Sequence, residues 1–524
     1  MLQPLRSALA LVAATGVIAC NASAQDKIIL AHYMPWYETP DVRGFWGFHW
    51  TGFNDEADPT QFVGPDNRRD IWSNYYPLIE PYDSADPDLL ECHLLQMKLA
   101  GIDGVLADWY GLSDAADYAI IHFATEALFD ATAEFGLQFG AVFEDRTYEF
   151  RVNNGLLNPG DVNADLAATM QWVQTNWFSS PHYAHKDGRP LLLNFGPIYL
   201  TTPTPWAVGF AALNPLPNFF ALSNLWTLAS AEGAFTWVRP SIFEDFPSSA
   251  VAQQRVADFF NVPGTTPANV IPSVNPGFDD VYAVPFPDIP YRNGDTFTDM
   301  LTVAMDGPWS HIQLVTWNDF GEGTMIEPTR EFGYLFLEKL QDARRAENPA
   351  FPYSAGDLRL PARLYTLRKD QNADQALLDE VLDRLKSGDT IAARVLLDLA
   401  EGVDLFTGDA ADAVVASGET ITLTAPNLPD ATGLYQWTRD GLALTDSARV
   451  SGATARTITI TPATLGDVGF YRLTVAAGST EARSEPTLVA VRGSAFDVLD
   501  VNDDGVLTTA DVQDFLGVHS VLAR

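Results

Sequence analysis

Strand-like and helix-like segments alternate along residues 27–345, and this alternation limits the fold more than any other feature of the sequence. The expected strands are short apolar runs at 27–33, 102–109, 137–143, 190–195, 218–223, 235–238, 270–275 and 311–317. Apolar residues at helical spacing lie between several of them, at 86–100, 118–135 and 164–177, with a last helix expected at 332–346. Such alternation is typical of parallel βαβ units, and eight units close into a barrel.

We therefore predict an α/β fold with a (β/α)8 barrel over residues 27–345. An open doubly wound sheet is the alternative. No glycine-rich phosphate loop follows any of the expected strands, which makes the open sheet the weaker choice.

The first 24 residues read as a signal peptide. Arg6 belongs to a short leading region, an apolar run follows, and Ala22-Ser23-Ala24 fits a cleavage site. The predicted location is secreted or periplasmic. Cys20 offers an alternative, since the residues before it resemble a lipobox and would make the protein an anchored lipoprotein.

Two segments of different character follow the predicted barrel. Residues 346–407 read as a linker and a pair of helices. Residues 408–492 change to short strands rich in Thr, Val and Leu, with Trp437 on one of them. This strand and the stretch that ends at Tyr471 resemble the tryptophan strand and the tyrosine corner of an immunoglobulin-like sandwich.

The tail, residues 495–524, contains a loop with the spacing of an EF-hand. Gly505 stands at the sharp turn, and oxygen ligands are expected from Asp500, Asn502, Asp504, Val506, Thr508 and Asp511. A hard cation needs several oxygens around one point, so we predict Ca²⁺ here; an acidic loop without metal is the alternative. Asp511 stands where Glu is more usual, which resembles dockerin repeats, but the tail has only one such loop.

The charge of the chain excludes two classes of partner. Asp and Glu number 68 against 31 Lys and Arg, for a net charge of −37. This excess disfavours nucleic acid and anionic membrane surfaces. No run reaches the length of a membrane helix, and the HExxH, GxSxG and P-loop motifs are absent. We expect no cofactor for catalysis.

Polar and aromatic residues follow the expected strands at the end where a barrel builds its active site. Carboxylates and amides bind sugar hydroxyls, while aromatic rings stack on sugar faces. The predicted substrate-binding residues are Tyr33, Trp36, His49, Trp50, Asp108, Trp109, Tyr110, Glu144, Asp145, Arg146, Asn194, Asn275, Phe278, Asp279, Trp317 and Asn318. The aromatic segment 38–81 reads either as a glycan platform or as a small core packed over the barrel.

Asp319 and Glu322 are the predicted catalytic pair. Glycosidic cleavage needs one protonated acid for the leaving oxygen and a second carboxylate to activate a nucleophile. Both residues follow the last expected strand, in a loop that contains glycine. We predict Glu322 as the acid and Asp319 as the base.

Residues 27–345 resemble glycoside hydrolases of families 71 and 99. The motifs are Tyr33-Met34-Pro35-Trp36-Tyr37, His49-Trp50, Pro81-Tyr82-Asp83-Ser84, Gly101-Ile102-Asp103-Gly104, Pro276-Gly277-Phe278-Asp279 and Trp317-Asn318-Asp319-Phe320-Gly321-Glu322-Gly323. The resemblance implies a barrel that cuts α-linked polysaccharide of the mannan or glucan type, in an endo fashion. Family 99 enzymes carry two Glu in the matching segment, so Asp319 is a departure, whereas family 71 carries an Asn-Asp-x-x-Glu pattern.

The sugar decides which reaction is open to such a pair. In an α-mannoside the axial O2 can attack C1 when a carboxylate deprotonates it, whereas in an α-glucoside O2 cannot reach the back face. Water driven by a base then inverts the configuration. Asp is one methylene shorter than Glu, so we hypothesise that Asp319 leaves room for water and favours inversion.

The sequence therefore predicts a secreted glycoside hydrolase whose partner is a polysaccharide or oligosaccharide. The immunoglobulin-like and EF-hand modules are the expected contacts for a protein or cell-surface partner. A glycan-binding protein on an inactive barrel is the main alternative. A glycosyltransferase-like role is a further alternative, which the signal peptide disfavours because nucleotide sugars are cytoplasmic.

Overall fold

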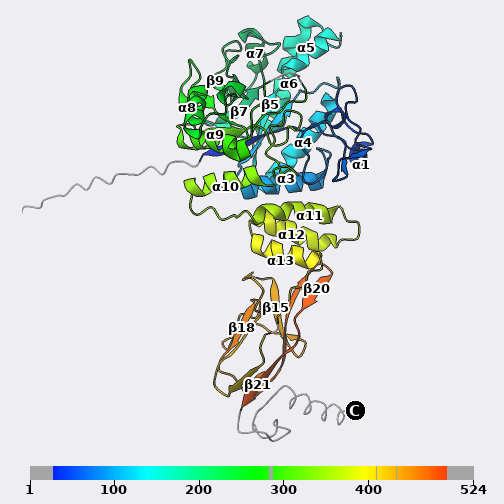
Figure 1. The fold of residues 1–524 in the computed structure, drawn as a ribbon, viewed down its shortest axis with the longest axis vertical. Helices are drawn as coiled ribbons and strands as arrows, with labels where there is room; N and C mark the ends of the chain where they lie inside the picture. Colours follow the sequence, from blue (N-terminus) through cyan, green and yellow to red (C-terminus); the bar gives the residue numbers. More distant parts are fainter. Residues whose placement is uncertain (1–26, 283–286, 409, 432, 493–524) are drawn as a thin grey trace, which may run out of the picture.

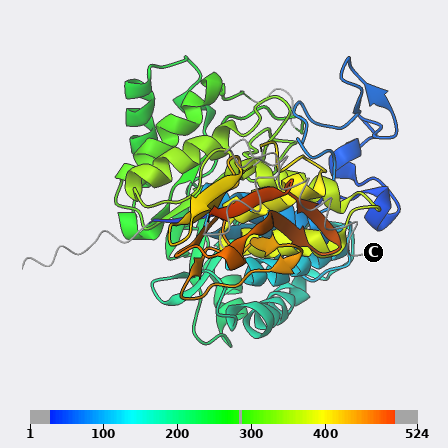
Figure 2. The same ribbon diagram turned by 90° about the horizontal axis from the view of Figure 1, so that it is seen from below.

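The computed structural model describes residues 27–282, 287–408, 410–431 and 433–492. The predicted signal peptide and the predicted calcium loop lie outside these residues. The described chain is a stack of three parts: a large α/β part, a layer of helices and a β-rich part. Figure 1 shows them one above another along the longest axis, and Figure 2 looks along this axis from the β-rich end.

The α/β part is a closed barrel of parallel strands. Its strands are β1 (Ile28–Tyr33), β4 (Gly104–Trp109), β5 (Gln138–Phe143), β7 (Arg189–Asn194), β8 (Asn218–Leu222), β9 (Gly233–Phe235), β10 (Val270–Ile271), β11 (Ser273–Val274) and β12 (His311–Leu314). Each pairs with its neighbour in the ring: β10 pairs with β9, β11 with β12, and β12 with β1. Pro272 separates β10 from β11, since proline has no N–H for the ladder. The predicted barrel is confirmed, and its closure excludes the open sheet.

Helices cover the outside of the barrel. They are α3 (Pro87–Ala100), α4 (Tyr118–Phe135), α5 (Arg146–Asn153), α6 (Val162–Val173), α7 (Pro203–Phe210), α8 (Ser249–Phe260), α9 (Asp295–Asp306) and α10 (Leu335–Glu347). Both ends of α3 are capped. The Asp86 side chain accepts the N–H of Asp88 at the start, and Gly101 takes a left-handed conformation at the end. Turns without a helix join β8 to β9.

Side chains alternate between the two faces of the barrel strands. One set fills the barrel interior: Leu30, Leu106, Val142, Leu191, Leu193, Phe220, Leu222, Phe235 and Ile271. Their neighbours in sequence, such as Ile29, Val105 and Leu192, pack outward against the helices. Because the period is two, the residue two positions beyond the last interior residue points into the mouth of the barrel.

The long segment after β1 folds over one side of the mouth. It contains α1 (Pro40–Arg43), α2 (Phe48–Thr51) and the small hairpin of β2 (Phe62–Val63) and β3 (Arg68–Arg69). Trp50 and Tyr76 are fully buried in a core that this segment shares with the barrel. A second small strand, β6 (His185–Lys186), pairs antiparallel with β7.

The middle layer has three helices where a pair was predicted. They are α11 (Leu360–Arg368), α12 (Gln375–Ser387) and α13 (Thr390–Ala400). The additional helix is α11, and its Pro361 lies in the first helical turn, where proline is well tolerated. Ion pairs join this layer to α3: Lys369 contacts Asp86 at 2.6 Å and Asp88 at 2.7 Å.

The β-rich part consists of two facing sheets. One runs β13 (Ala413–Ala416), β21 (Thr487–Arg492), β19 (Gly469–Ala477), β15 (Tyr435–Arg439) and β16 (Leu442–Ala443), with β20 (Thr480–Arg483) beside β19. The other runs β14 (Ile421–Thr424), β18 (Thr457–Ile460) and β17 (Val450–Ser451). Trp437 is buried, and the Tyr471 hydroxyl donates to the Asp467 carbonyl at 2.8 Å. The immunoglobulin-like assignment stays a prediction.

No helix within the described residues is both long and apolar enough to span a membrane.

Candidate active site

A cavity of about 370 Å³ opens at the mouth of the barrel, where the carboxyl ends of the strands meet. Its lining combines carboxylates, aromatic rings and one guanidinium group. The residues are His32, Met34, Trp36, His49, Phe53, Asp108, Tyr110, Glu144, Arg146, Phe195, Trp237, Asp280, Tyr282, Asp319 and Glu322. The predicted catalytic pair therefore lies at one cavity, on the face where barrel enzymes place their chemistry.

The pair sits on a tightly closed loop after β12, which we call the acid loop (residues 316–324). The Thr316 N–H donates to the Thr324 carbonyl at 2.8 Å, which closes the loop at its base. Inside it, the Thr316 hydroxyl accepts the N–H of Asp319 at 2.8 Å. The carboxylate of Asp319 in turn accepts the N–H of Glu322 at 2.9 Å. These bonds fix the position of one acid relative to the other.

Asn318 ties the acid loop to the end of β1. Its side-chain oxygen accepts the N–H of Met34 at 2.8 Å, and its amide donates to the Met34 carbonyl at 3.0 Å. The Tyr37 hydroxyl donates to the Asn318 carbonyl at 2.9 Å. Since Asn318 is fully buried, it positions the loop and does not reach the cavity, which corrects its predicted role as a substrate ligand.

The segment after β11 lies against the opposite side of the acid loop. The N–H of Asp279 donates to the Glu322 carbonyl at 2.9 Å, and the N–H of Val281 donates to the Gly321 carbonyl at 2.9 Å. Tyr282 then covers Gly321 so closely that a Cβ on this glycine would lie 2.0 Å from the ring. Glycine is thus required at 321 for the approach of the tyrosine.

Burial and mutual repulsion raise the pKa values of the two acids on this loop. Burial, together with repulsion from the nearby Asp108 and Asp280, raises the pKa of Asp319 to about 7, although hydrogen bonds from backbone N–H groups oppose the rise. Burial, followed by repulsion from Asp319, raises the pKa of Glu322 well above its ordinary value. One carboxyl oxygen of Glu322 is buried without a hydrogen-bond partner in the described structure, so a proton there offsets the cost of burying charge.

Across the mouth, a second acidic group follows β4 and β5. The Asp108 carboxylate lies 3.9 Å from the His32 ring nitrogen, and burial raises its pKa. Burial, then repulsion from Asp108, raises the pKa of Glu144, while Arg146 opposes both. Arg146 is the only Lys or Arg of the lining, so the cavity is rich in acid with a single fixed cation.

Eight of the eighteen predicted catalytic and substrate-binding residues line this cavity: Trp36, His49, Asp108, Tyr110, Glu144, Arg146 and the two acids. The rings of Trp36 and His49 stack at 4.1 Å with an interplanar angle of 2°. Burial lowers the pKa of His49 well below its ordinary value, so this imidazole is neutral. Together they form a flat aromatic wall beside the acid loop.

The other predicted substrate ligands do not line the cavity, and their side chains are surrounded by other parts of the fold. They are Tyr33, Trp50, Trp109, Asp145, Asn194, Asn275, Phe278, Asp279, Trp317 and Asn318. Tyr33, Trp109 and Asn194 stand on the outward face of their strands, which is the physical reason for the correction. Asp145 is turned away as well: it accepts the backbone N–H groups of 198, 199 and 200 at 2.7–3.0 Å.

Several lining residues were missing from the predicted site: His32, Met34, Phe53, Phe195, Trp237, Asp280 and Tyr282. Strand parity could have found three of them, because His32, Phe195 and Trp237 each lie two positions beyond an interior residue. Asp280 and Tyr282 lie in a loop whose path has no periodic signal.

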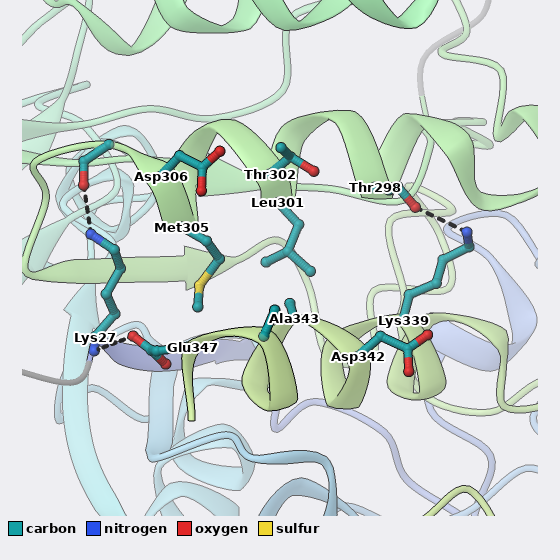
Figure 3. Close-up of a pocket in the computed structure, with 12 residues that line it drawn as sticks. Lys27, Thr298, Leu301, Thr302, Met305, Asp306, Lys339, Asp342, Ala343 and Glu347 are labelled. Carbon is teal, nitrogen blue, oxygen red and sulfur yellow. Dashed lines mark hydrogen bonds between the residues drawn. The ribbon is translucent and has the colours of Figure 1, made fainter. Parts of the chain in front are cut away.

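A larger cavity of about 610 Å³ lies elsewhere, between α9 and α10 on the outside of the barrel. Figure 3 shows its lining, in which Lys27 donates to the Gly307 carbonyl at 2.6 Å and Lys339 to the Thr298 hydroxyl at 2.9 Å. It has no aromatic ring in its lining, and Lys27 places it at the amino end of β1. Size alone therefore does not mark the site of chemistry.

Within the described residues, no group of three or more His, Cys, Asp or Glu side chains is arranged to hold a metal ion.

Replacement of Asp319 by Asn tests the electrostatics of the cavity. Because folding raises the pKa of this carboxyl from its ordinary value of 3.8 to about 7, the folded state binds the extra proton, and stability falls as pH rises through this window. We expect Asp319→Asn to unfold at a temperature several degrees higher than wild type at pH 8, a gain on the order of 2 kcal/mol that vanishes near pH 4.

Calorimetric melting at both pH values measures this difference. Asp145→Asn is the matched control, and it should lower the melting temperature at pH 8 because the Asp145 carboxylate accepts backbone N–H groups. Equal melting temperatures for Asp319→Asn and wild type at pH 8 would contradict the buried, repelling site.

Comparisons with known proteins agree with this geometry. Residues 24–212 match the sequence model of glycosyl hydrolase family 99, a match that ends before the acid loop. A mouse glycoprotein endo-alpha-1,2-mannosidase-like protein is 26% identical over 347 residues, 59% of this chain and 72% of that protein. The glycoprotein endo-alpha-1,2-mannosidase of Xenopus laevis is 25% identical over 325 residues, 56% of this chain and 68% of that protein.

Among solved structures, the GH99 endo-alpha-mannosidase of Bacteroides thetaiotaomicron aligns with 62% of this chain and 99% of its own, at a TM-score of 0.46 and 22% identity. A protein described as glycoside hydrolase-like aligns with 61% of this chain and 94% of its own, at a TM-score of 0.44 and 14% identity. The sequence matches and the acid pair at the barrel mouth together make this chain a glycoside hydrolase that is similar to family 99.

Proposed function

We propose that the barrel hydrolyses internal α-mannosidic bonds, with Glu322 as the general acid and Asp319 as the base. The observation that carries this proposal is the placement of both carboxyls on one clamped loop at one aromatic-walled cavity. The named relatives are endo-alpha-1,2-mannosidases, which favours α-mannoside over α-glucoside as the substrate and an internal bond as the point of cleavage.

The raised pKa values support these two roles. Burial raises the pKa of Glu322 well above the ordinary value, which favours the protonated form that can donate to the leaving glycosidic oxygen. Asp319, with a pKa of about 7, is partly ionised at the same pH and can accept a proton from the nucleophile.

The remaining lining suits a neutral sugar. The stacked Trp36 and His49 offer an apolar face, while Asp108, Glu144 and Arg146 offer hydrogen-bonding groups for hydroxyls. These polar groups stand across the mouth from the acid loop, since β5 lies three strands away from β12 in the ring. A pyranose held between them would present its glycosidic oxygen to the acid loop.

Replacement of Glu322 by Gln tests the catalytic role. We expect the variant to release reducing ends from α-mannan about 10²- to 10⁴-fold more slowly than wild type, because an amide cannot donate the proton. Its binding of the same mannan in affinity electrophoresis should persist. Glu126→Gln, which changes an exposed acid on α4, is the control and should leave the rate unchanged. A wild-type chain that binds mannan but never releases reducing ends would support the glycan-binding alternative.

The anomer of the first product tests the action of Asp319. The carboxylate is held back by its bond to the N–H of Glu322, and its side chain is short, so we expect it to activate water and to give the β-anomer by inversion. Proton NMR during the first minutes of α-mannan digestion measures the product. An α-anomer at that stage would contradict direct attack by water on C1.

We also propose that the chain is exported and that its tail binds Ca²⁺ through the loop of 500–511, beside an immunoglobulin-like module that contacts a protein or a cell surface. The support is the sequence of the leader and the EF-hand spacing of the tail. Titration of the full chain with Ca²⁺ by calorimetry should show one site that Asp500→Ala abolishes. Binding that survives this change would place the ion elsewhere.

A further inference from the structure

Phe53 differs from the other large aromatic residues of the segment after β1. Trp50 and Tyr76 are fully buried in its core, whereas 60% of Phe53 is exposed. Isolated exposed apolar side chains are common on protein surfaces, so exposure alone carries no argument. What distinguishes Phe53 is its place, because it lines the same cavity as the acid pair.

Neighbouring rings orient Phe53. Its ring centroid lies 5.2 Å from that of Phe48, 5.0 Å from that of Trp72 in an edge contact, and 5.9 Å from that of Tyr282. Phe53 is therefore the outermost member of an aromatic cluster that continues down to the acid loop. The contacts with Phe48 and Tyr282 are tilted and that with Trp72 is edge-on, and together they leave 60% of Phe53 exposed.

The backbone around Phe53 is also held in place. The N–H of Ala57 donates to the Thr51 carbonyl at 2.8 Å, and the Glu56 carboxylate accepts the N–H and the side-chain amide of Asn54 at 2.8 and 2.9 Å. Gly52 adopts a φ of 90°, a conformation that other residues rarely take. These bonds define the turn from which Phe53 extends.

The ring of Tyr282 lies between Phe53 and the acid loop. This ring contacts Phe53 on one side and covers Gly321, the residue between the two acids, on the other. Phe53 is thus one aromatic ring away from the acid loop, on the side of β11 and β12. Glu144 and Arg146 stand on the side of β5, so contacts for sugars exist on both sides of the acid pair.

We propose that Phe53 is the stacking platform for a pyranose ring beyond the two that share the cleaved bond, and that it makes the site prefer a long α-linked chain. This inference rests on the proposed function and adds a residue that determines chain-length preference. The apolar face of a pyranose would cover the exposed part of Phe53, while its hydroxyls would remain in water. A glycan held on both sides of the acids is cut internally.

Hydrolysis of α-mannan and of α-mannooligosaccharides of increasing length tests the inference. We expect Phe53→Ala to raise KM about 3- to 10-fold for the polymer, with kcat and the rate on the shortest cleaved oligosaccharide nearly unchanged. Phe53→Trp should restore the wild-type KM, because an aromatic face is what matters. Phe62→Ala is the matched control: this ring belongs to the same segment, is 53% exposed and does not line the cavity.

Two outcomes would overturn the inference while leaving the proposed function intact: an unchanged KM for Phe53→Ala at every chain length, or an equal loss for Phe62→Ala. If wild type releases no reducing ends at all, the proposed function fails instead. Affinity electrophoresis in α-mannan then decides the stacking role by itself. Mobility of Phe53→Ala equal to wild type in that gel would contradict it, and weaker retardation than wild type would support it.

Discussion

The alternation of side chains along closed parallel strands is the constraint on which the site depends. A barrel strand has two faces, one toward the packed interior and one toward the helices, and it changes face at every residue. His32, Asp108 and Glu144 point into the mouth because Leu30, Leu106 and Val142, two positions earlier, fill the interior. The same rule turns Tyr33, Trp109 and Asp145 away from the mouth, although they are adjacent in sequence and chemically just as suitable.

The fold holds the two carboxyls of the acid loop in positions that lower the stability of the folded chain. Buried carboxyls that repel each other destabilise the folded chain, and their raised pKa values express that cost. Hydrogen bonds through Asn318, Tyr37 and Thr316 to the backbone hold the loop in spite of it. These bonds do not use the acid side chains, although the Asp319 carboxylate itself accepts the N–H of Glu322. The rigidity of the site thus comes from residues that never touch the cavity.

The sequence predicts the barrel well because periodicity is a local property. Each expected strand overlaps an observed one, and Pro272 alone divides a predicted strand in two. The acid pair was also predictable, since it follows the last strand. Residues such as Asn318 or Asp145 could not be separated from true lining residues by chemical type. Phe53 and Tyr282 come from loops whose course depends on tertiary contacts, so nothing local indicated that they would meet.

The later parts of the chain do not complete the cavity. Its lining ends with Glu322, and the helical layer packs on α3 at the outside of the barrel through Lys369. The layer is in turn joined to the β-rich part by Asp374, which caps α12 and accepts the N–H and the hydroxyl of Ser479 at 2.6 and 2.7 Å (Figure 1). Because one carboxylate serves both a helix end and a neighbouring hairpin, the direction of the β-rich part is coupled to that of the helices. Among the residues that the structure describes, the lining of the cavity therefore comes from the barrel and its loops alone.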